Sequence, residues 1–150
     1  MEVLGETFMS LPTSQDCILD HIAIAVKSIS ASQKIYEDLG MTFSGIIEEV
    51  VDQKVLTTFA QIDVNAHIEL LEPTSNESAI HKFIESKGEG IHHLCFKVLN
   101  VKNKTLELSQ KGYKFIYPEP RIGAGGCLVN FIHPKSTGGV LIEISQRPQI

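Results

Sequence analysis

The chain has 150 residues, of which 43% are apolar and 21% charged, and it carries a net charge of -5 with a pI near 5.6. This composition is typical of one globular domain with a sizeable core. The acidic balance argues against a nucleic-acid-binding protein, because phosphate recognition depends on clustered Lys and Arg. No apolar run reaches the length of a membrane span.

The cysteines are Cys17, Cys95 and Cys127. Their wide spacing and odd number argue against a disulfide framework or a zinc knuckle, so a reducing compartment is the simplest interpretation. Residues 1–17 are rich in loop formers and lack the basic segment that begins a signal peptide. We therefore expect a flexible N-terminal arm over 1–17 and a cytoplasmic protein, or an organelle protein whose transit peptide has been removed.

The rest of the chain, 18–150, is predicted to form a single domain. A strand at 18–26 precedes a helix that begins at Ser28 or Ser30 and ends at Gly40. Three strands follow, at 43–51, 55–62 and 67–72, and Pro73 closes a first module, 18–73. A connector, 74–90, holds a short helix over 78–86.

The second module, 91–147, repeats this order. It contains a strand at 91–98, a helix at 101–110 and strands at 113–117, 128–132 and 140–145. Two loops rich in Gly and Pro, 118–126 and 134–139, separate the last strands, and binding residues often lie in such loops. Each module thus has the order βαβββ, which predicts an α+β fold with helices on the outer face of a sheet.

An internal duplication relates the two modules. A shift of 72 residues places His21 on His93 and Gly40 on Gly112, and it also matches Val26 to Val98 without a gap. A shift that persists over such a stretch indicates a repeated unit.

The duplication singles out four polar residues on apolar strands. His21 and His93 lie on the first strand of each module, and Glu69 and Glu143 lie on the last. Because side chains alternate along a strand, each of these residues faces away from its apolar neighbours, toward the inner side of the sheet. Two imidazoles and two carboxylates that converge in this way form a divalent metal site of mixed N and O character. The simpler alternative is that each is an ordinary polar residue on a solvent-exposed face.

The neighbouring His92 competes with His93 for this role. The register that aligns Val26 with Val98 selects His93, and it places His92 on the opposite face, near a helix. We therefore expect a buried, hydrogen-bonded His92.

Several segments resemble the vicinal oxygen chelate superfamily, and within it the methylmalonyl-CoA epimerases. They are LDHIAIAV (19–26), IELLEP (68–73), GIHHLCFKV (90–98), EPRIGAGG (119–126) and FIHPKSTGGVLIEISQ (131–146). The first three occur across the superfamily, whereas the last two are more specific to the epimerases. The resemblance implies two paired βαβββ modules that form a curved, cleft-like mixed sheet, and it implies a homodimer.

The resemblance also implies a function for the site. His21, Glu69, His93 and Glu143 would bind one divalent ion, with Co²⁺ as first choice and Zn²⁺, Ni²⁺, Mn²⁺ or Fe²⁺ as alternatives. An acyl-CoA substrate would lose its C2 proton to Glu143, the catalytic base, and pass through an enolate. Residues of the two loops would bind the substrate, namely Gly123, Gly125, Lys135 and Ser136.

One position departs from the family pattern. Some epimerases have an additional glutamate on the third strand as a second base, and Thr57 stands there in this chain. Glu48 and Glu49 lie on the preceding strand and do not match, which leaves the second acid or base unassigned.

Two other functions compete with epimerisation. A glyoxalase I-type lactoylglutathione lyase would use the same ion and the same enolate chemistry. A metal-free small-molecule-binding protein of the same fold is an alternative of another class, but such proteins commonly lack the full set of ligands.

Overall fold

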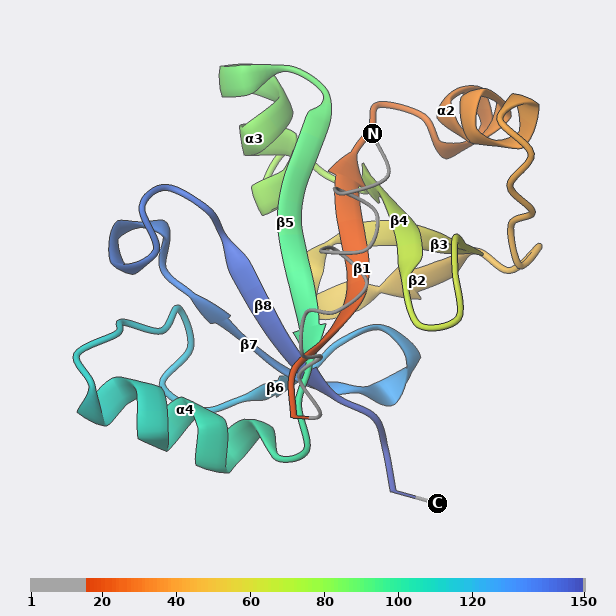
Figure 1. Ribbon diagram of the computed structural model, residues 1–150. Coiled ribbons are helices and arrows are strands. Elements are labelled where there is room, and N and C mark those ends of the chain that lie inside the picture. Colours follow the sequence, from red (N-terminus) through yellow and green to blue (C-terminus); the bar gives the residue numbers. More distant parts are fainter. Residues whose placement is uncertain (1–15, 150) are drawn as a thin grey trace, which may run out of the picture.

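A computed structural model describes residues 16–149 of the chain. They form one curved eight-stranded mixed sheet in the order β2-β3-β4-β1-β5-β8-β7-β6. β1 (Ile18–Ala25) and β5 (Gly90–Lys97) run antiparallel at its centre, and Figure 1 shows them side by side. The predicted α+β class and the curved mixed sheet are thereby confirmed. The exact division into an arm and two modules stays a proposal, and residues 1–15 of the arm lie outside the described residues.

Each side of the sheet has the same internal pairing. β1 runs parallel to β4 (His67–Pro73), which pairs with β3 (Val55–Gln61) and then β2 (Glu48–Val50). β5 runs parallel to β8 (Ile142–Gln146), which pairs with β7 (Leu128–Ile132) and then β6 (Arg121–Ile122). The two ligand-bearing strands of each module are therefore direct neighbours.

Two helices cover the outer face, as the sequence predicts. α2 (Ile29–Asp38) begins at Ser28, whose side chain accepts the N–H of Ala31, and it packs through Ile29 on a cluster with Leu70. α4 (Val101–Gln110) begins at Asn100 and packs through Val101 on Val98 and Ile144. In Figure 1 these helices lie at opposite ends of the sheet.

The connector helix takes a different place. α3 (Ala79–Lys87) buries Ile80 and Ile84 in a cluster with Ala23, Ala25 and Leu71, which are residues of the inner face. It therefore closes one end of the cleft rather than covering the outer face. The helices within residues 16–149 are too short and too polar to cross a membrane.

Some predicted strand limits were wrong. The strand expected at 43–51 is reduced to β2 and an isolated bridge from Phe43 to Ala60. The strand expected at 113–117 is only a bridge from Phe115 to Ile132, and the loop after it contains the unpredicted β6. Both strands lie near the edges of the sheet, where a single neighbour leaves the local sequence free to break the ladder.

Candidate metal centre

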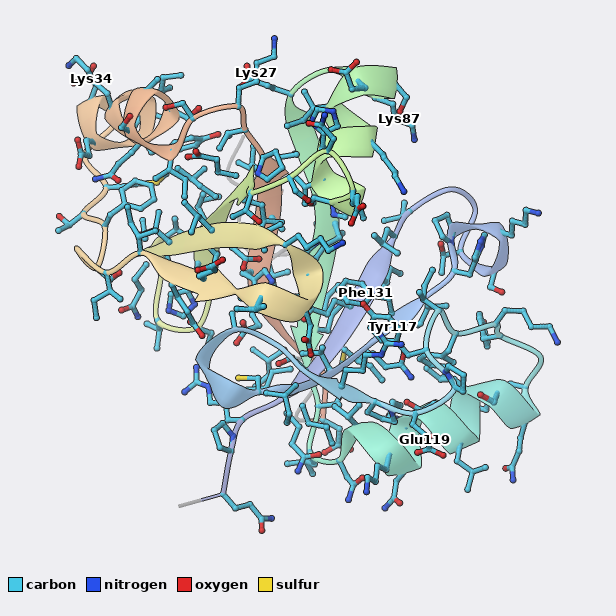
Figure 2. The ribbon with its side chains drawn as sticks, turned by 180° about the vertical axis from the view of Figure 1, so that it is seen from behind. Lys27, Lys34, Lys87, Tyr117, Glu119 and Phe131 are labelled. Atoms are coloured by element: carbon cyan, nitrogen blue, oxygen red, sulfur yellow. The ribbon has the colours of Figure 1, made fainter. Side chains whose placement is uncertain are left out.

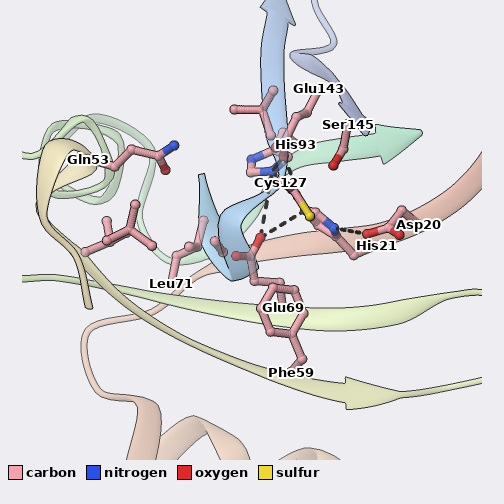
Figure 3. A pocket seen from close by; sticks show the side chains of 14 residues that line it. Asp20, His21, Gln53, Phe59, Glu69, Leu71, His93, Cys127, Glu143 and Ser145 are labelled. Carbon is pink, nitrogen blue, oxygen red and sulfur yellow. Dashed lines mark hydrogen bonds and ion pairs between the residues drawn. The ribbon is translucent and has the colours of Figure 1, made fainter. Parts of the chain in front are cut away.

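The four predicted ligands meet on the inner face of the sheet. The Nε2 atom of His21 lies 3.0 Å from Oε2 of Glu69 and 3.3 Å from Oε2 of Glu143. The Nε2 atom of His93 lies 2.7 Å from the same oxygen of Glu143 and 3.9 Å from Oε2 of Glu69. The two Nε2 atoms are 3.4 Å apart, and each of the four residues is at most 7% exposed. Figure 3 shows this convergence within a pocket.

Strand pairing explains why residues so distant in sequence meet. Glu69 lies opposite Ala23 on the parallel β1–β4 ladder, and His93 lies opposite Ala23 on the β1–β5 ladder. Glu143 lies opposite Cys95 on the β5–β8 ladder, and Cys95 lies opposite His21. The small, fully buried Ala23 and Cys95 leave space between the predicted ligands.

Each histidine has a second partner at its other ring nitrogen. Nδ1 of His21 lies 2.7 Å from Oδ2 of Asp20, and Nδ1 of His93 lies 2.9 Å from Nδ1 of His92. His92 is hydrogen-bonded, as predicted, but it is half-buried rather than buried, and its ring lies 5.0 Å from that of Phe83 on α3, not against a helix of the outer face. Its predicted face was wrong, however, since it turns toward the cleft side beside His93.

Contacts between the rings and carboxylates of the cluster shift the pKa values of both kinds of group. Burial alone lowers the pKa of His21, but contacts with Asp20, Cys95, Glu143 and Glu69 outweigh it and raise that pKa well above its ordinary value. Burial alone raises the pKa of Glu143, but hydrogen bonds with His21 and His93 outweigh it and lower that pKa. The metal-free cluster therefore holds ionised Glu143 against a protonated His21.

The two carboxylates differ in how they are held. Oε1 of Glu69 accepts a hydrogen bond of 2.7 Å from the hydroxyl of Thr57, which is buried on β3. Glu143 is contacted through Oε2 by the Nε2 atoms of both His21 and His93. Glu69 is thus held at both oxygens, by Thr57 and His21, whereas both histidines contact Glu143 at the same oxygen.

Three cavities have a residue of the cluster in their walls, and one of them, of about 450 Å³, lies between His93 and the residues Pro134 and Gly139. A cavity of about 60 Å³ lies directly among the ligands, and Phe59 and Cys127 also line it (Figure 3). A larger one of about 350 Å³ lies against His93 and has an apolar wall that includes Val55, Tyr117 and Phe131. Figure 2 shows Tyr117 and Phe131, which belong to the second module, beside the β2–β3 hairpin.

The predicted substrate-binding residues take several positions. A side chain at Gly123 would approach Val129 to 3.3 Å, and Gly125 adopts a positive φ of 63° at the cleft rim. Lys135 is exposed, and the hydroxyl of Ser136 accepts the N–H of Lys114 at 2.9 Å. Of the glycine-rich loop 118–126, Ala124 lines the smallest cavity, whereas Gly123, Gly125, Lys135 and Ser136 line none of the three cavities, and the binding roles of these four residues stay predictions.

Residues that the sequence patterns missed also face the cleft. Gln53 lines the cavities of about 60 Å³ and 350 Å³ and precedes Lys54, whose φ of 54° is left-handed. Glu48 lies opposite Thr57 on the β2–β3 ladder and accepts the N–H of Gly125 at 3.0 Å. Asp20 was also missed, and its position directly before His21 was the one local signal that could have indicated a residue of the site.

These residues fit a divalent ion. Nε2 of His21, Nε2 of His93 and a carboxylate oxygen of Glu143 all lie within 4.8 Å of one another, and Oε2 of Glu69 lies beside them. The donors are buried, converge on a small cavity and combine imidazole with carboxylate, which suits Zn²⁺ and the neighbouring transition metals.

Comparisons with known proteins give matches over most of the chain. Residues 20–131 match the family model of the Glyoxalase/Bleomycin resistance protein/Dioxygenase superfamily. The chain is 40% identical to the uncharacterized protein YqjC of Bacillus subtilis, covering 85% of this chain and 91% of that one. It is 35% identical to the mitochondrial methylmalonyl-CoA epimerase of Dictyostelium discoideum, covering 86% and 78%. A variant of the Streptomyces coelicolor methylmalonyl-CoA epimerase in complex with 2-nitronate-propionyl-CoA superposes with a TM-score of 0.85 at 30% identity, covering 90% and 100%.

Proposed function

Since the chain belongs to the Glyoxalase/Bleomycin resistance protein/Dioxygenase superfamily, we propose that it epimerises methylmalonyl-CoA at C2 with the help of a divalent metal ion. The observation that carries this proposal is the buried convergence of His21, Glu69, His93 and Glu143. The epimerases among its relatives supply the substrate class.

The proposed ion is bound by the two Nε2 atoms and the two carboxylates. When bound, it would polarise the thioester carbonyl and so lower the pKa of the C2 proton. Co²⁺ is the first candidate, with Zn²⁺, Ni²⁺, Mn²⁺ and Fe²⁺ as alternatives, because all of them accept imidazole and carboxylate ligands.

Glu143 is the proposed catalytic base. Its carboxylate is ionised in the metal-free cluster, and both histidines contact it at one oxygen, Oε2. Glu143 takes the C2 proton, and the electron pair of the broken C–H bond enters the enolate of the thioester. Glu69 is the weaker candidate because Thr57 and His21 occupy its two oxygens.

Epimerisation needs a second proton delivery, on the opposite face of the enolate. The hydroxyl of Thr57 donates to Glu69 and does not replace an acid. A water molecule or another acid therefore returns the proton and forms the new C–H bond. Glu48 lies opposite Thr57 on the β2–β3 ladder. Its carboxylate accepts the N–H of Gly125, which belongs to the facing loop.

The cavity of about 350 Å³ suits the substrate's acyl and thioester part. It shares His93 and Gln53 with the ligand cavity, and its apolar wall is suited to a short alkyl chain. We propose that the acyl-CoA enters there. Of the two loops, 118–126 lines the ligand cavity through Ala124, and 134–139 lines a further cavity beside His93 through Pro134 and Gly139. Cys95 and Cys127 carry free thiols, which supports the proposal of a reducing compartment, the cytoplasm.

Isotope exchange tests the proposed function. The protein is loaded with each candidate ion and incubated with methylmalonyl-CoA in D₂O, and deuterium entry at C2 is followed by mass spectrometry. We expect exchange with at least one ion and none after chelation. No exchange with any ion would refute the epimerase proposal.

A parallel reaction separates the rival enzyme. The same loaded protein is given the hemithioacetal of methylglyoxal and glutathione. We expect no product from it, whereas turnover of this substrate without C2 exchange would assign the glyoxalase I activity instead.

A further inference from the structure

Two β-bulges lie in the central β1–β5 ladder. Leu19 pairs with Phe96 and His21 pairs with Cys95, so Asp20 is the additional residue on β1. Ala23 pairs with His93 and Ile24 pairs with Ile91, so His92 is the additional residue on β5. Each bulge therefore places its unpaired residue directly before a ligand histidine.

The bulges change where these residues point. In a regular strand, neighbouring side chains face opposite sides of the sheet, so Asp20 and His92 would face away from the rings that follow them. A bulge breaks this alternation and redirects a side chain. Asp20 thereby lines the ligand cavity, and His92 lines the neighbouring one.

We propose that Asp20 and His92 are positioning residues for the metal ion. Each accepts a hydrogen bond from the Nδ1–H group of the ligand histidine that follows it. The inference rests on the proposed metal site. A neutral imidazole carries one proton, and a ring that gives its Nε2 lone pair to a metal must carry that proton on Nδ1. Acceptors at 2.7 Å from His21 and 2.9 Å from His93 hold both rings in the required tautomer and orientation.

The two acceptors differ in chemistry although they occupy equivalent places. Asp20 presents a carboxylate oxygen, and His92 presents a ring nitrogen that packs against Phe83. A carboxylate acceptor increases the electron density of the ligand ring more than a neutral nitrogen does. The structure thus assigns His21, rather than His93, as the histidine that donates its Nε2 lone pair to the metal ion more strongly.

Metal affinity tests the proposal without relying on activity. Asp20→Leu and His92→Phe keep the branched or ring shape of the side chain but remove the acceptor, whereas Asp20→Asn and His92→Gln keep an acceptor oxygen. We expect the first pair to raise the dissociation constant for Zn²⁺ by about 10- to 100-fold, measured by competition with a chromophoric chelator. The second pair should recover most of the affinity, and His81→Phe, which removes a histidine from α3, should match the unchanged protein.

Two further readouts exclude a merely structural effect. Urea unfolding of each metal-free variant shows whether the fold is retained, and ¹⁵N NMR of the Zn²⁺-loaded protein identifies the tautomer of each ring. Signals of Nδ1–H tautomers at His21 and His93 are expected. Equal Zn²⁺ affinity in all variants, or loss in the Leu and Phe variants without recovery in the Asn and Gln variants, would overturn the positioning role alone. Failure of the unchanged protein to bind any divalent ion would overturn the metal site as well.

Discussion

At the scale of single residues, the site is built from a few contacts that make chemically similar groups unequal. Glu69 and Glu143 share strand position and burial, yet Thr57 holds one oxygen of Glu69, whereas both histidines contact the same oxygen of Glu143. His21 and His93 have different acceptors at Nδ1. Acid–base roles therefore follow from neighbours rather than from residue type.

Replacement of the proposed base, Glu143, tests whether Glu69 and Glu143 have different roles. Glu143→Gln should lower the rate of C2 exchange by about 10²- to 10⁴-fold, because an amide cannot accept the proton. Exchange is measured at saturating Co²⁺, so that weaker metal binding does not account for the loss. Glu69→Gln, the matched variant, should lose metal affinity first and regain part of its rate at high Co²⁺. Equal, fully rescuable losses in both variants would contradict the assignment of Glu143.

The charge state of the cluster predicts how stability depends on pH. The folded pKa of His21 is raised, so its contribution is complete below the ordinary value of 6.5 and is lost as the pH rises beyond it. The free energy of unfolding of the metal-free protein should therefore fall by about 1.4 kcal/mol per pH unit above that value from this residue. The folded pKa of Glu143 is lowered, so its contribution is lost only as the pH falls below its ordinary value of 4.5.

Urea unfolding at pH 6, 7 and 8 in the presence of a chelator measures this slope. In the His21→Phe variant the free energy of unfolding should no longer fall with rising pH in this way, whereas the His81→Phe variant should keep the slope. In the metal-loaded protein the trend should weaken or reverse, because the ion displaces the proton of His21. A metal-free protein whose stability is constant over this range would contradict the raised pKa of His21.

At the scale of elements, the three helices have two different tasks. α2 and α4 cover the outer face of the sheet, whereas α3 inserts Ile80 and Ile84 against the inner-face residues Ala23, Ala25 and Leu71. The same helix carries Phe83, which packs on His92. α3 is therefore both a wall of the cleft and a support for the centre.

A pair of identical substitutions measures this support. Ile84→Ala, at a position 8% exposed, should lower the free energy of unfolding by about 2–5 kcal/mol. Ile35→Ala on α2, at a position 61% exposed, should change it by about 0.5 kcal/mol or less. Urea denaturation of both variants provides the comparison, and similar losses would mean that α3 is not packed as described.

At the scale of the whole molecule, the sheet leaves part of its outer face uncovered. Ile22 and Ile24 on β1 and Leu94 and Phe96 on β5 are only half-buried, and they lie between the areas that α2 and α4 cover. Ile91 nearby is 63% exposed. An apolar area at the centre of the molecule supports the proposed homodimer.

Sedimentation of the protein at micromolar concentration tests the dimer. We expect the mass of two chains, and Phe96→Glu should shift it to one chain because a buried carboxylate is costly. Ile35→Glu, on the outer surface of α2, is the control and should leave the dimer intact. A single-chain mass for the unchanged protein would remove the proposal.

The sequence alone determined much of this protein, because its information is local and repeated. The period-two alternation of the strands and the shift of 72 residues were enough to select His21, Glu69, His93 and Glu143 and to predict the α+β class. The structure brings these side chains together as expected.

Only the tertiary structure decided how the centre is arranged. The bulges at Asp20 and His92 arise from pairing between β1 and β5, whose partners are about seventy residues apart, and they break the alternation on which the sequence prediction for His92 depended. The contact of Thr57 with Glu69, the position of α3 and the bond between Glu48 and Gly125 are likewise contacts between distant elements. Local periodicity specifies which face a residue occupies, but the register between strands specifies which atoms meet.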